Sequence, residues 1–192
     1  MSGGREGNRP RHLVLIGMMG AGKSTVGQRC AKRLGRPFVD TDERIAADAG
    51  ASVAEVFARD GEPAFRELER RAVADACASV EPTVIAAGGG AVLDAENRRR
   101  MRETGLVVWL QAPVAQLAAR VGDGRGRPLL QQSSPDESSP KGAAGTLARL
   151  ERQRRPAYEA AAHATVDTAG LGVASVVDAV LAALTATEEW VS

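Results

Sequence analysis

The run GMMGAGKS at residues 17–24 constrains this chain more than any other feature, because it fits the pattern G-x-x-x-x-G-K-[ST] in full. An apolar stretch, HLVLI at residues 12–16, precedes the run, and a helical pattern from Ser24 to Leu34 follows it. Glycines let successive backbone N–H groups point at phosphate oxygens, and the start of the helix adds partial positive charge. The run therefore predicts a phosphate-binding loop between a buried strand and a helix.

Two side chains of this loop have expected roles. Lys23 would reach the terminal phosphates of a nucleotide, and the Ser24 hydroxyl would ligate Mg²⁺. The alternative is a glycine-rich turn with an accidental lysine, which the strand and helix on either side disfavour. The residues expected to bind nucleotide are Gly20, Ala21, Gly22, Lys23, Ser24 and Thr25.

Short apolar runs alternate with helical stretches along the rest of the chain, which is typical of parallel α/β folds. We expect strands over residues 12–16, 38–42, 83–87, 106–110 and 164–167. We expect helices over residues 24–34, 62–80, 94–104, 113–121, 146–162 and 173–186, with a capping box at Ser52 opening a further short helix. This order predicts one α/β domain over residues 12–187, with a five-stranded parallel sheet in a three-layer α/β/α arrangement.

Composition narrows the class of protein further. The net charge of +1 and the 3% aromatic content argue against a broad nucleic-acid surface, and no apolar run approaches a membrane span. Cys30 and Cys77 lack zinc-site spacing and are expected as buried free thiols, which fits a reducing cytoplasm. Residues 1–11 and 188–192 are expected as tails, the first of them disordered.

Residues 122–145 form a Gly-, Ser- and Pro-rich stretch without an apolar period. A loop of this length in a small domain is typically a functional lid or a disordered segment. A mobile arginine such as Arg127 would stabilise charge on a migrating phosphoryl group. An ordinary charge on a surface loop explains Arg127 equally well.

Asp40 and Asp42 follow the second predicted strand. If the chain is extended there, both carboxylates lie on the same side, since side chains two residues apart in a strand share a face. One would hold Mg²⁺ through water, and the other would orient a substrate hydroxyl. An Asx-type turn or a helix cap is the alternative.

Further polar segments follow the other predicted strands, and ligands of open parallel sheets bind at the carboxyl ends of the strands. The glycines 88–90 would allow a ligand close to the backbone, or simply form a tight turn. Arg66 lies among charged neighbours and, from its surroundings alone, fits a solvated helix face better than a site. Arg154 and Arg155 belong to a basic cluster that fits either interpretation. A GTPase is disfavoured because no N-K-x-D sequence occurs.

Six motifs together resemble one family: GMMGAGKST, VDTDERI, DGEPAFRELE, AAGGGAV, GRGRPLL and RQRRPAY. In this order and spacing the chain resembles the shikimate kinases, in the nucleoside-monophosphate-kinase-like branch of P-loop folds, from Leu13 to the last helix. The resemblance implies transfer of the γ-phosphate of ATP to the 3-hydroxyl of shikimate with Mg²⁺, a step toward chorismate and the aromatic amino acids. It also implies a cytoplasmic monomer without nucleic-acid or membrane partners.

The resemblance also implies roles for individual residues. Lys23, Asp42 and Arg127 would be catalytic, and Ser24 and Asp40 would hold the metal. Arg120 would flank adenine, Arg127 would also contact ATP, and Glu69 would steady Arg66. The residues implied for shikimate binding are Asp42, Arg66, Gly88, Gly89, Gly90, Arg127 and Arg155.

The chain departs from the family pattern at two places. The Ser/Pro-rich run QQSSPDESSPKGAAG lengthens the expected lid, and residues 169–171 lack the arginine that relatives often place on the adenine side.

Two rival functions remain. Another small-molecule kinase, such as a gluconate kinase, would share the phosphate loop without the carboxylate-binding arginines. A nucleotide-binding regulator would have no need for Asp42 together with a lid arginine.

Overall fold

The computed structural model describes residues 12–121 and 140–190, and within them the five strands run parallel in one sheet. The strand order is β2-β3-β1-β4-β5, with β1 in the centre between β3 and β4. The five-stranded parallel sheet predicted from the apolar runs is confirmed. The strands are β1 His12–Ile16, β2 Phe38–Asp40, β3 Val84–Ala86, β4 Gly105–Gln111 and β5 Ala164–Asp167.

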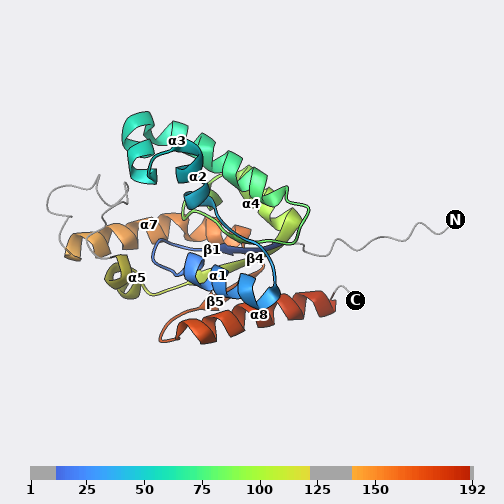
Figure 1. Cartoon of the computed structure of the whole chain (residues 1–192). Helices are drawn as coiled ribbons and strands as arrows, with labels where there is room; N and C mark the ends of the chain where they lie inside the picture. The colour runs from blue at the N-terminus through green and yellow to red at the C-terminus, as the bar shows by residue number, and fades with distance from the viewer. Residues whose placement is uncertain (1–11, 122–139, 191–192) are drawn as a thin grey trace.

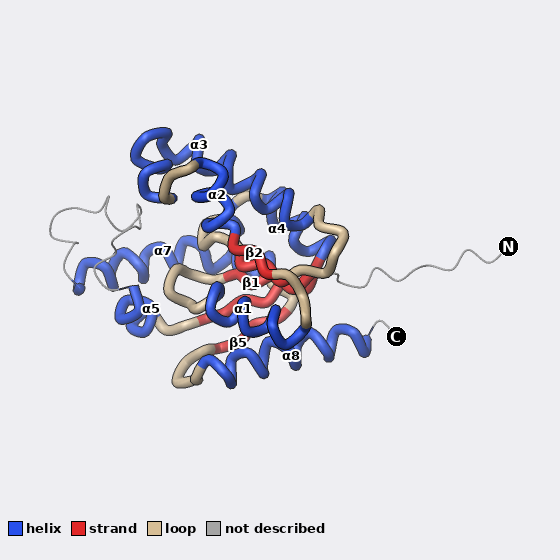
Figure 2. The backbone as a smooth tube through the Cα atoms, viewed as in Figure 1, coloured by secondary structure: helices blue, strands red, loops and turns tan. Residues whose placement is uncertain are grey.

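Helices cover both faces of the sheet, which gives the three layers expected (Figures 1 and 2). Helices α1 (Lys23–Leu34) and α8 (Val173–Trp190) pack on one face. Helices α4 (Ala95–Thr104) and α7 (Pro140–Ala161) pack on the other, and α5 (Val114–Val121) lies beside α7. β1 is buried along its whole length, as its apolar sequence requires for a strand covered on both faces.

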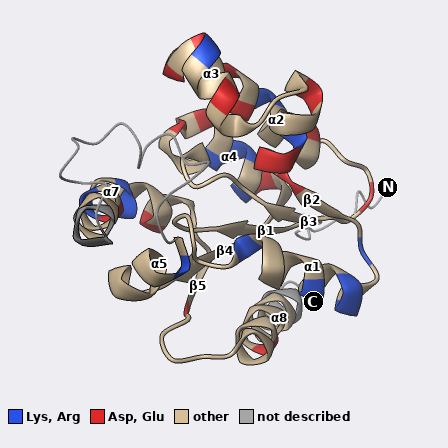
Figure 3. Ribbon diagram, turned by 60° about the vertical axis from the view of Figure 1, so that its left-hand side comes forward, with Lys and Arg blue, Asp and Glu red and all other residues tan. Residues whose placement is uncertain are grey.

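A helical excursion between β2 and β3 forms a second, smaller core. It consists of α2 (Thr41–Ala49) and α3 (Val53–Cys77), and the capping box predicted at Ser52 is present at the start of α3. Gly61 interrupts α3 with a positive φ of 79°, a conformation that glycine adopts without strain. Figure 3 shows acidic positions gathered on α2 and α3, with basic positions among them. The small core comprises Ile45, Val56, Phe57, Phe65 and Ala72.

Element ends differ from expectation in several places. The helix expected over residues 62–80 ends at Cys77 and leaves Val80 86% exposed. α7 begins at Pro140, inside the stretch expected as lid, and α8 continues to Trp190, inside the expected tail. A short 3₁₀ helix, η1 (Ala91–Leu93), was not predicted. Arg127, most of the lid stretch and residues 1–11 lie outside the described residues.

Two expectations drawn from composition can be compared with the structure. Cys30 and Cys77 are both buried free thiols, as predicted. Among the helices that the structure describes, none has the length and hydropathy needed to cross a bilayer.

Candidate active site

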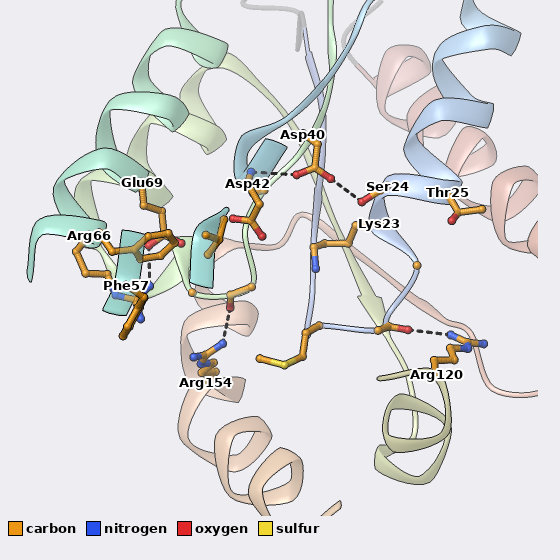
Figure 4. Close-up of a pocket in the computed structure, with 18 residues that line it drawn as sticks. Lys23, Ser24, Thr25, Asp40, Asp42, Phe57, Arg66, Glu69, Arg120 and Arg154 are labelled. Atoms are coloured by element: carbon orange, nitrogen blue, oxygen red, sulfur yellow. Dashed lines mark hydrogen bonds and ion pairs between the residues drawn. The ribbon is translucent and has the colours of Figure 1, made fainter. Parts of the chain in front are cut away.

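A cavity of about 540 Å³ opens at the carboxyl edge of the sheet (Figure 4). Its walls come from the phosphate loop, the start of α2, the two halves of α3, the glycines after β3, and one arginine each from α5 and α7. The phosphate loop, the Asp40–Asp42 segment and the glycines 88–90, which the sequence predicted at one edge of the sheet, therefore do meet. The lining residues used below are Gly20, Gly22, Lys23, Ser24, Thr25, Asp40, Asp42, Phe57, Phe65, Arg66, Glu69, Gly89, Gly90, Arg120 and Arg154.

The phosphate loop has the backbone shape that anion binding needs. Gly20 and Gly22 take positive φ angles of 81° and 92°, which an L side chain rarely adopts. Gly22 is the N-cap of α1 and has no side chain to satisfy the first helical N–H groups. Lys23 curls over the loop, and its Nζ donates to the carbonyls of Gly17 at 2.8 Å and Met18 at 3.1 Å. Donors and positive charge thus gather at this end of the cavity.

Among the described residues of the predicted nucleotide-binding set, Ala21 alone does not line the cavity. Its side chain is buried, and its N–H donates to the Met18 carbonyl at 3.1 Å within the loop. The motif constrains the backbone at this position, and the side chain serves the packing of the loop.

Asp40 acts as a helix cap and also contacts the phosphate loop. Its Oδ1 accepts the N–H of Asp42 at 3.0 Å and caps α2, while its Oδ2 accepts from the Ser24 hydroxyl at 2.5 Å. The expectation of an extended Asp40–Asp42 segment is wrong, because the cap starts a helix at Thr41. Both carboxylates nevertheless line the cavity, since they lie on either side of that helix start.

Two of the three glycines after β3, Gly88 and Gly90, lie where a Cβ would come too close to a side chain of the site. A Cβ on Gly88 would lie 2.5 Å from Asp42 Oδ1, and one on Gly90 would lie 2.2 Å from Arg66 Nη1. The Gly88 N–H donates to the buried Thr41 hydroxyl at 2.8 Å. Gly88, which was expected to bind the substrate, lies close to Asp42 and does not line the cavity, whereas Gly89 and Gly90 do.

Arg66 faces the cavity, so the interpretation of its charged neighbourhood as a solvated face is wrong for this residue. Its side chain is only 19% exposed, and its Nη1 donates to Glu69 Oε2 at 2.8 Å. Burial raises the pKa of Glu69, although Arg66 opposes the shift. Burial lowers the pKa of Arg66, but Glu69 and Glu62 outweigh it and the net shift is upward. The guanidinium therefore stays charged beside the cavity (Figure 4).

The second cavity arginine from the RQRRPAY motif is Arg154, and the assignment of Arg155 is corrected. Arg154 is 3% exposed, and its Nη1 donates to the Gly89 carbonyl at 3.0 Å (Figure 4). Arg155 instead lies over the Trp109 ring, 5.4 Å from its centroid, and pairs with Glu151. Neighbouring residues on a helix point about 100° apart, so only one of the two arginines can enter the cavity.

The spacing of buried residues along α7 could have identified Arg154. Positions 147, 150, 154, 158 and 161 are all buried and recur every three or four residues, as one face of a helix does. Arg154 is the charged member of this face. Tyr158, one turn later, donates its hydroxyl to the same Gly89 carbonyl at 2.7 Å. Burial raises the pKa of Tyr158 to about 12, so the hydroxyl stays protonated as a donor.

Two further features complete the walls. Arg120 Nη1 donates to the Gly20 carbonyl at 3.3 Å, beside the phosphate loop. Phe57 and Phe65, with ring centroids 5.2 Å apart, give the cavity an apolar side that the sequence did not predict. Both rings also belong to the small core, and nothing local to either residue indicated a site.

Replacing Arg154 or Arg155 with alanine tests which of the two arginines belongs to the cavity. Arg154→Ala is expected to raise KM for the second substrate by about 10- to 100-fold, because a buried charge-assisted contact is lost. Arg155→Ala is expected to change KM less than about threefold, since Arg155 does not line the cavity and its ion pair with Glu151 lies outside it. Steady-state kinetics on both variants provide the measurement, and a larger KM effect from Arg155→Ala would restore the original assignment.

The strand order and the phosphate loop are those of a P-loop kinase. The same cavity also holds carboxylates and arginines that can bind a second molecule, so the protein is a P-loop kinase that acts on a small molecule. A protein-family model for shikimate kinase matches residues 19–185 of the chain. The chain belongs to the shikimate kinase family.

Individual relatives agree with this membership. The chain is 49% identical over 159 residues to a shikimate kinase of Symbiobacterium thermophilum, covering 82% of this chain and 86% of the relative. It is 44% identical over 181 residues to a shikimate kinase of Salinibacter ruber, covering 94% and 87% of the two chains. Its structure resembles that of the Acinetobacter baumannii shikimate kinase in complex with shikimate, with a TM-score of 0.84, 32% identity, and coverage of 91% and 93%. The family expected from the six motifs is confirmed.

Proposed function

We propose that this protein transfers the γ-phosphate of ATP to the 3-hydroxyl of shikimate, giving ADP and shikimate 3-phosphate on the route to chorismate and the aromatic amino acids. One observation carries the proposal: Asp42, Arg66 and Arg154 line the same cavity as Lys23 and the phosphate loop. The complex of the Acinetobacter baumannii relative with shikimate supports this choice of acceptor.

The acceptor half of the cavity suits a small hydroxylated acid. Arg66 and Arg154 offer guanidinium groups, whose planar N–H donors match a carboxylate. Asp42 would orient the hydroxyl that attacks the phosphate and accept its proton. Phe57 and Phe65 would pack against the apolar part of the ring. Catalysis would rest mainly on positioning and on charge stabilisation, as in other phosphoryl transfers.

Ser24 and Asp40 fit a Mg²⁺ ion that accompanies ATP. Their hydroxyl and carboxylate oxygens lie 2.5 Å apart, where the end of the phosphate loop meets the end of β2, and Mg²⁺ prefers oxygen ligands completed by phosphates and waters. When bound, the ion would neutralise part of the phosphate charge. Asp40 would keep the Ser24 hydroxyl in place for it.

Two arginines are proposed for the nucleotide side. Arg120 would flank the adenine, since it lies in the cavity wall next to Gly20. Arg127 would contact the γ-phosphate, and this role depends on the GRGRPLL motif alone. The adenine contacts after β5 would be made by backbone or apolar groups, and we propose a cytoplasmic monomer.

A coupled assay of ADP release tests the proposed acceptor. Shikimate, gluconate and nucleoside monophosphates would be compared at equal concentration with ATP and Mg²⁺. We expect shikimate to give the highest kcat/KM by at least about 100-fold, because the site is built to pair a carboxylate and ring hydroxyls. Faster turnover with gluconate would favour the other small-molecule kinase, and ATP binding without turnover of any acceptor would favour the regulator.

A further inference from the structure

Arg66 lies between two carboxylates that differ in their surroundings. On the inner side, Nη1 donates to Glu69, whose side chain is 3% exposed. On the outer side, Nη2 and Nε donate to Oε1 of Glu62 at 2.9 and 3.3 Å, and the Glu62 side chain is 52% exposed. Glu69 belongs to the site as described above. Glu62 is not part of the cavity wall and has no role in the proposed function.

The contacts with Glu62 and Glu69 leave some N–H donors of Arg66 available for a ligand. A guanidinium has five N–H groups, one on Nε and two on each Nη. The contacts of Arg66 with Glu62 and Glu69 use three of them, one on each nitrogen. One N–H therefore remains on each Nη, which is the pair that a carboxylate accepts in a bidentate contact. The guanidinium lines the cavity, so these two donors are the ones a bound acid would find.

The backbone places Glu62 for this contact. Gly61 breaks α3 with its positive φ, and Glu62 is the first residue of the helix that resumes after it. Arg66 follows one turn later, and a glutamate four residues before an arginine is the favourable order for a helical ion pair. The kink and the ion pair together hold the outer edge of the guanidinium, which is the edge formed by Nε and Nη2.

We infer that Glu62 is a positioning residue, which holds the outer edge of Arg66 so that its two remaining donors meet the substrate carboxylate. This inference rests on the proposed function, because Arg66 binds the shikimate carboxylate there. Without Glu62, Arg66 would have to be ordered when the substrate binds, and that ordering weakens affinity. The opposing possibility is that Glu62 competes with the substrate for Arg66, in which case its removal strengthens binding.

Glu67 offers a matched control on the same helix. Its side chain is 46% exposed and pairs with Arg70 and Arg71, and none of these three residues lines the cavity. Replacing Glu67 therefore removes the same charge from a similar helical ion pair without touching Arg66. Exposed pairs of this kind contribute little to stability, so both variants are expected to fold.

The experiment is a calorimetric titration of the full-length wild type, Glu62→Ala, Glu62→Gln and Glu67→Ala, with shikimate and with its neutral methyl ester. We expect Glu62→Ala to weaken shikimate binding about three- to tenfold, as loss of one ordered side chain does. Glu62→Gln keeps one acceptor oxygen and should recover part of the loss. Glu67→Ala should bind shikimate as the wild type does. In the Glu62 variants, kcat and KM for ATP should change less than about twofold. The loss of affinity caused by Glu62→Ala should be smaller with the methyl ester than with shikimate.

Several results would overturn the inference: unchanged or tighter shikimate binding by Glu62→Ala, or an equal loss with the methyl ester. An equal loss in Glu67→Ala would also contradict it, because the effect would then belong to the helix and not to Arg66. If the wild type itself does not bind shikimate, the proposed function fails, which this design separates from a failure of the role of Glu62.

Discussion

Replacing Lys23 with alanine is expected to lower kcat for phosphoryl transfer by about 100-fold or more, as removal of a preorganised charge from a transition state does. Lys23 Nζ lies over the phosphate loop, held by two backbone carbonyls of that loop, so its charge is in place before the nucleotide binds. The coupled ADP-release assay at saturating substrates measures the effect. Lys32→Ala provides the control, because Lys32 is an exposed residue on the same helix.

A kcat for Lys23→Ala within about threefold of the wild type would contradict the assignment of the loop, since a preorganised charge contributes far more than that. Comparable losses in Lys23→Ala and Lys32→Ala would point to a general effect of charge on α1. Thermal unfolding of both variants would identify a loss of fold as the cause.

Asp42→Asn is expected to lower kcat by about 100- to 10,000-fold while ATP affinity stays within about threefold, because general-base contributions are of this size. The amide keeps the shape of the carboxylate, and so the close approach of Gly88 to Asp42 is preserved. It removes the charge that would orient the attacking hydroxyl and accept its proton. Steady-state kinetics and a nucleotide titration measure the two quantities separately.

Asp48→Asn is the matched control for this variant, since Asp48 lies on the same helix and pairs with Arg44 at the surface. Equal losses of kcat and of ATP affinity in Asp42→Asn would count against a substrate-orienting role. They would instead place Asp42 in the nucleotide half of the cavity.

The phosphate loop and the sheet were the parts most fully predictable from the sequence. Both depend on local information: an apolar run buried on two faces, glycines at positions of positive φ, and a helix that starts at the loop. The order of the strands and the position of the α2–α3 excursion were not predicted. They depend on contacts between residues far apart in the chain.

The Asp40–Asp42 segment was predictable only as a pair of alternatives. An acidic residue after a strand can cap a helix or bind a cation, and beside a phosphate loop the sequence favoured the functional use over the cap. In the structure one carboxylate oxygen of Asp40 caps α2 and the other accepts from Ser24. The helix cap therefore does not remove Asp40 from the phosphate loop.

Arg66 and Arg154 were the hardest site residues to identify, for different physical reasons. The charged neighbours of Arg66 on α3 hide the fact that its own side chain faces Gly90, which only the fold brings close. Arg154 was missed because the motif has three arginines within four residues, RQRR. Matching a motif does not show which of these arginines lies on the helix face toward the cavity. The period of buried residues along α7 does fix it.

The most direct test of the central claim is nuclear magnetic resonance analysis of the product formed from ATP and shikimate. We expect a phosphate monoester at carbon 3 of shikimate, formed in step with ADP. Release of inorganic phosphate alone, or a phosphate at another hydroxyl, would contradict the claim that Asp42 and the two cavity arginines position the 3-hydroxyl beside the phosphate loop.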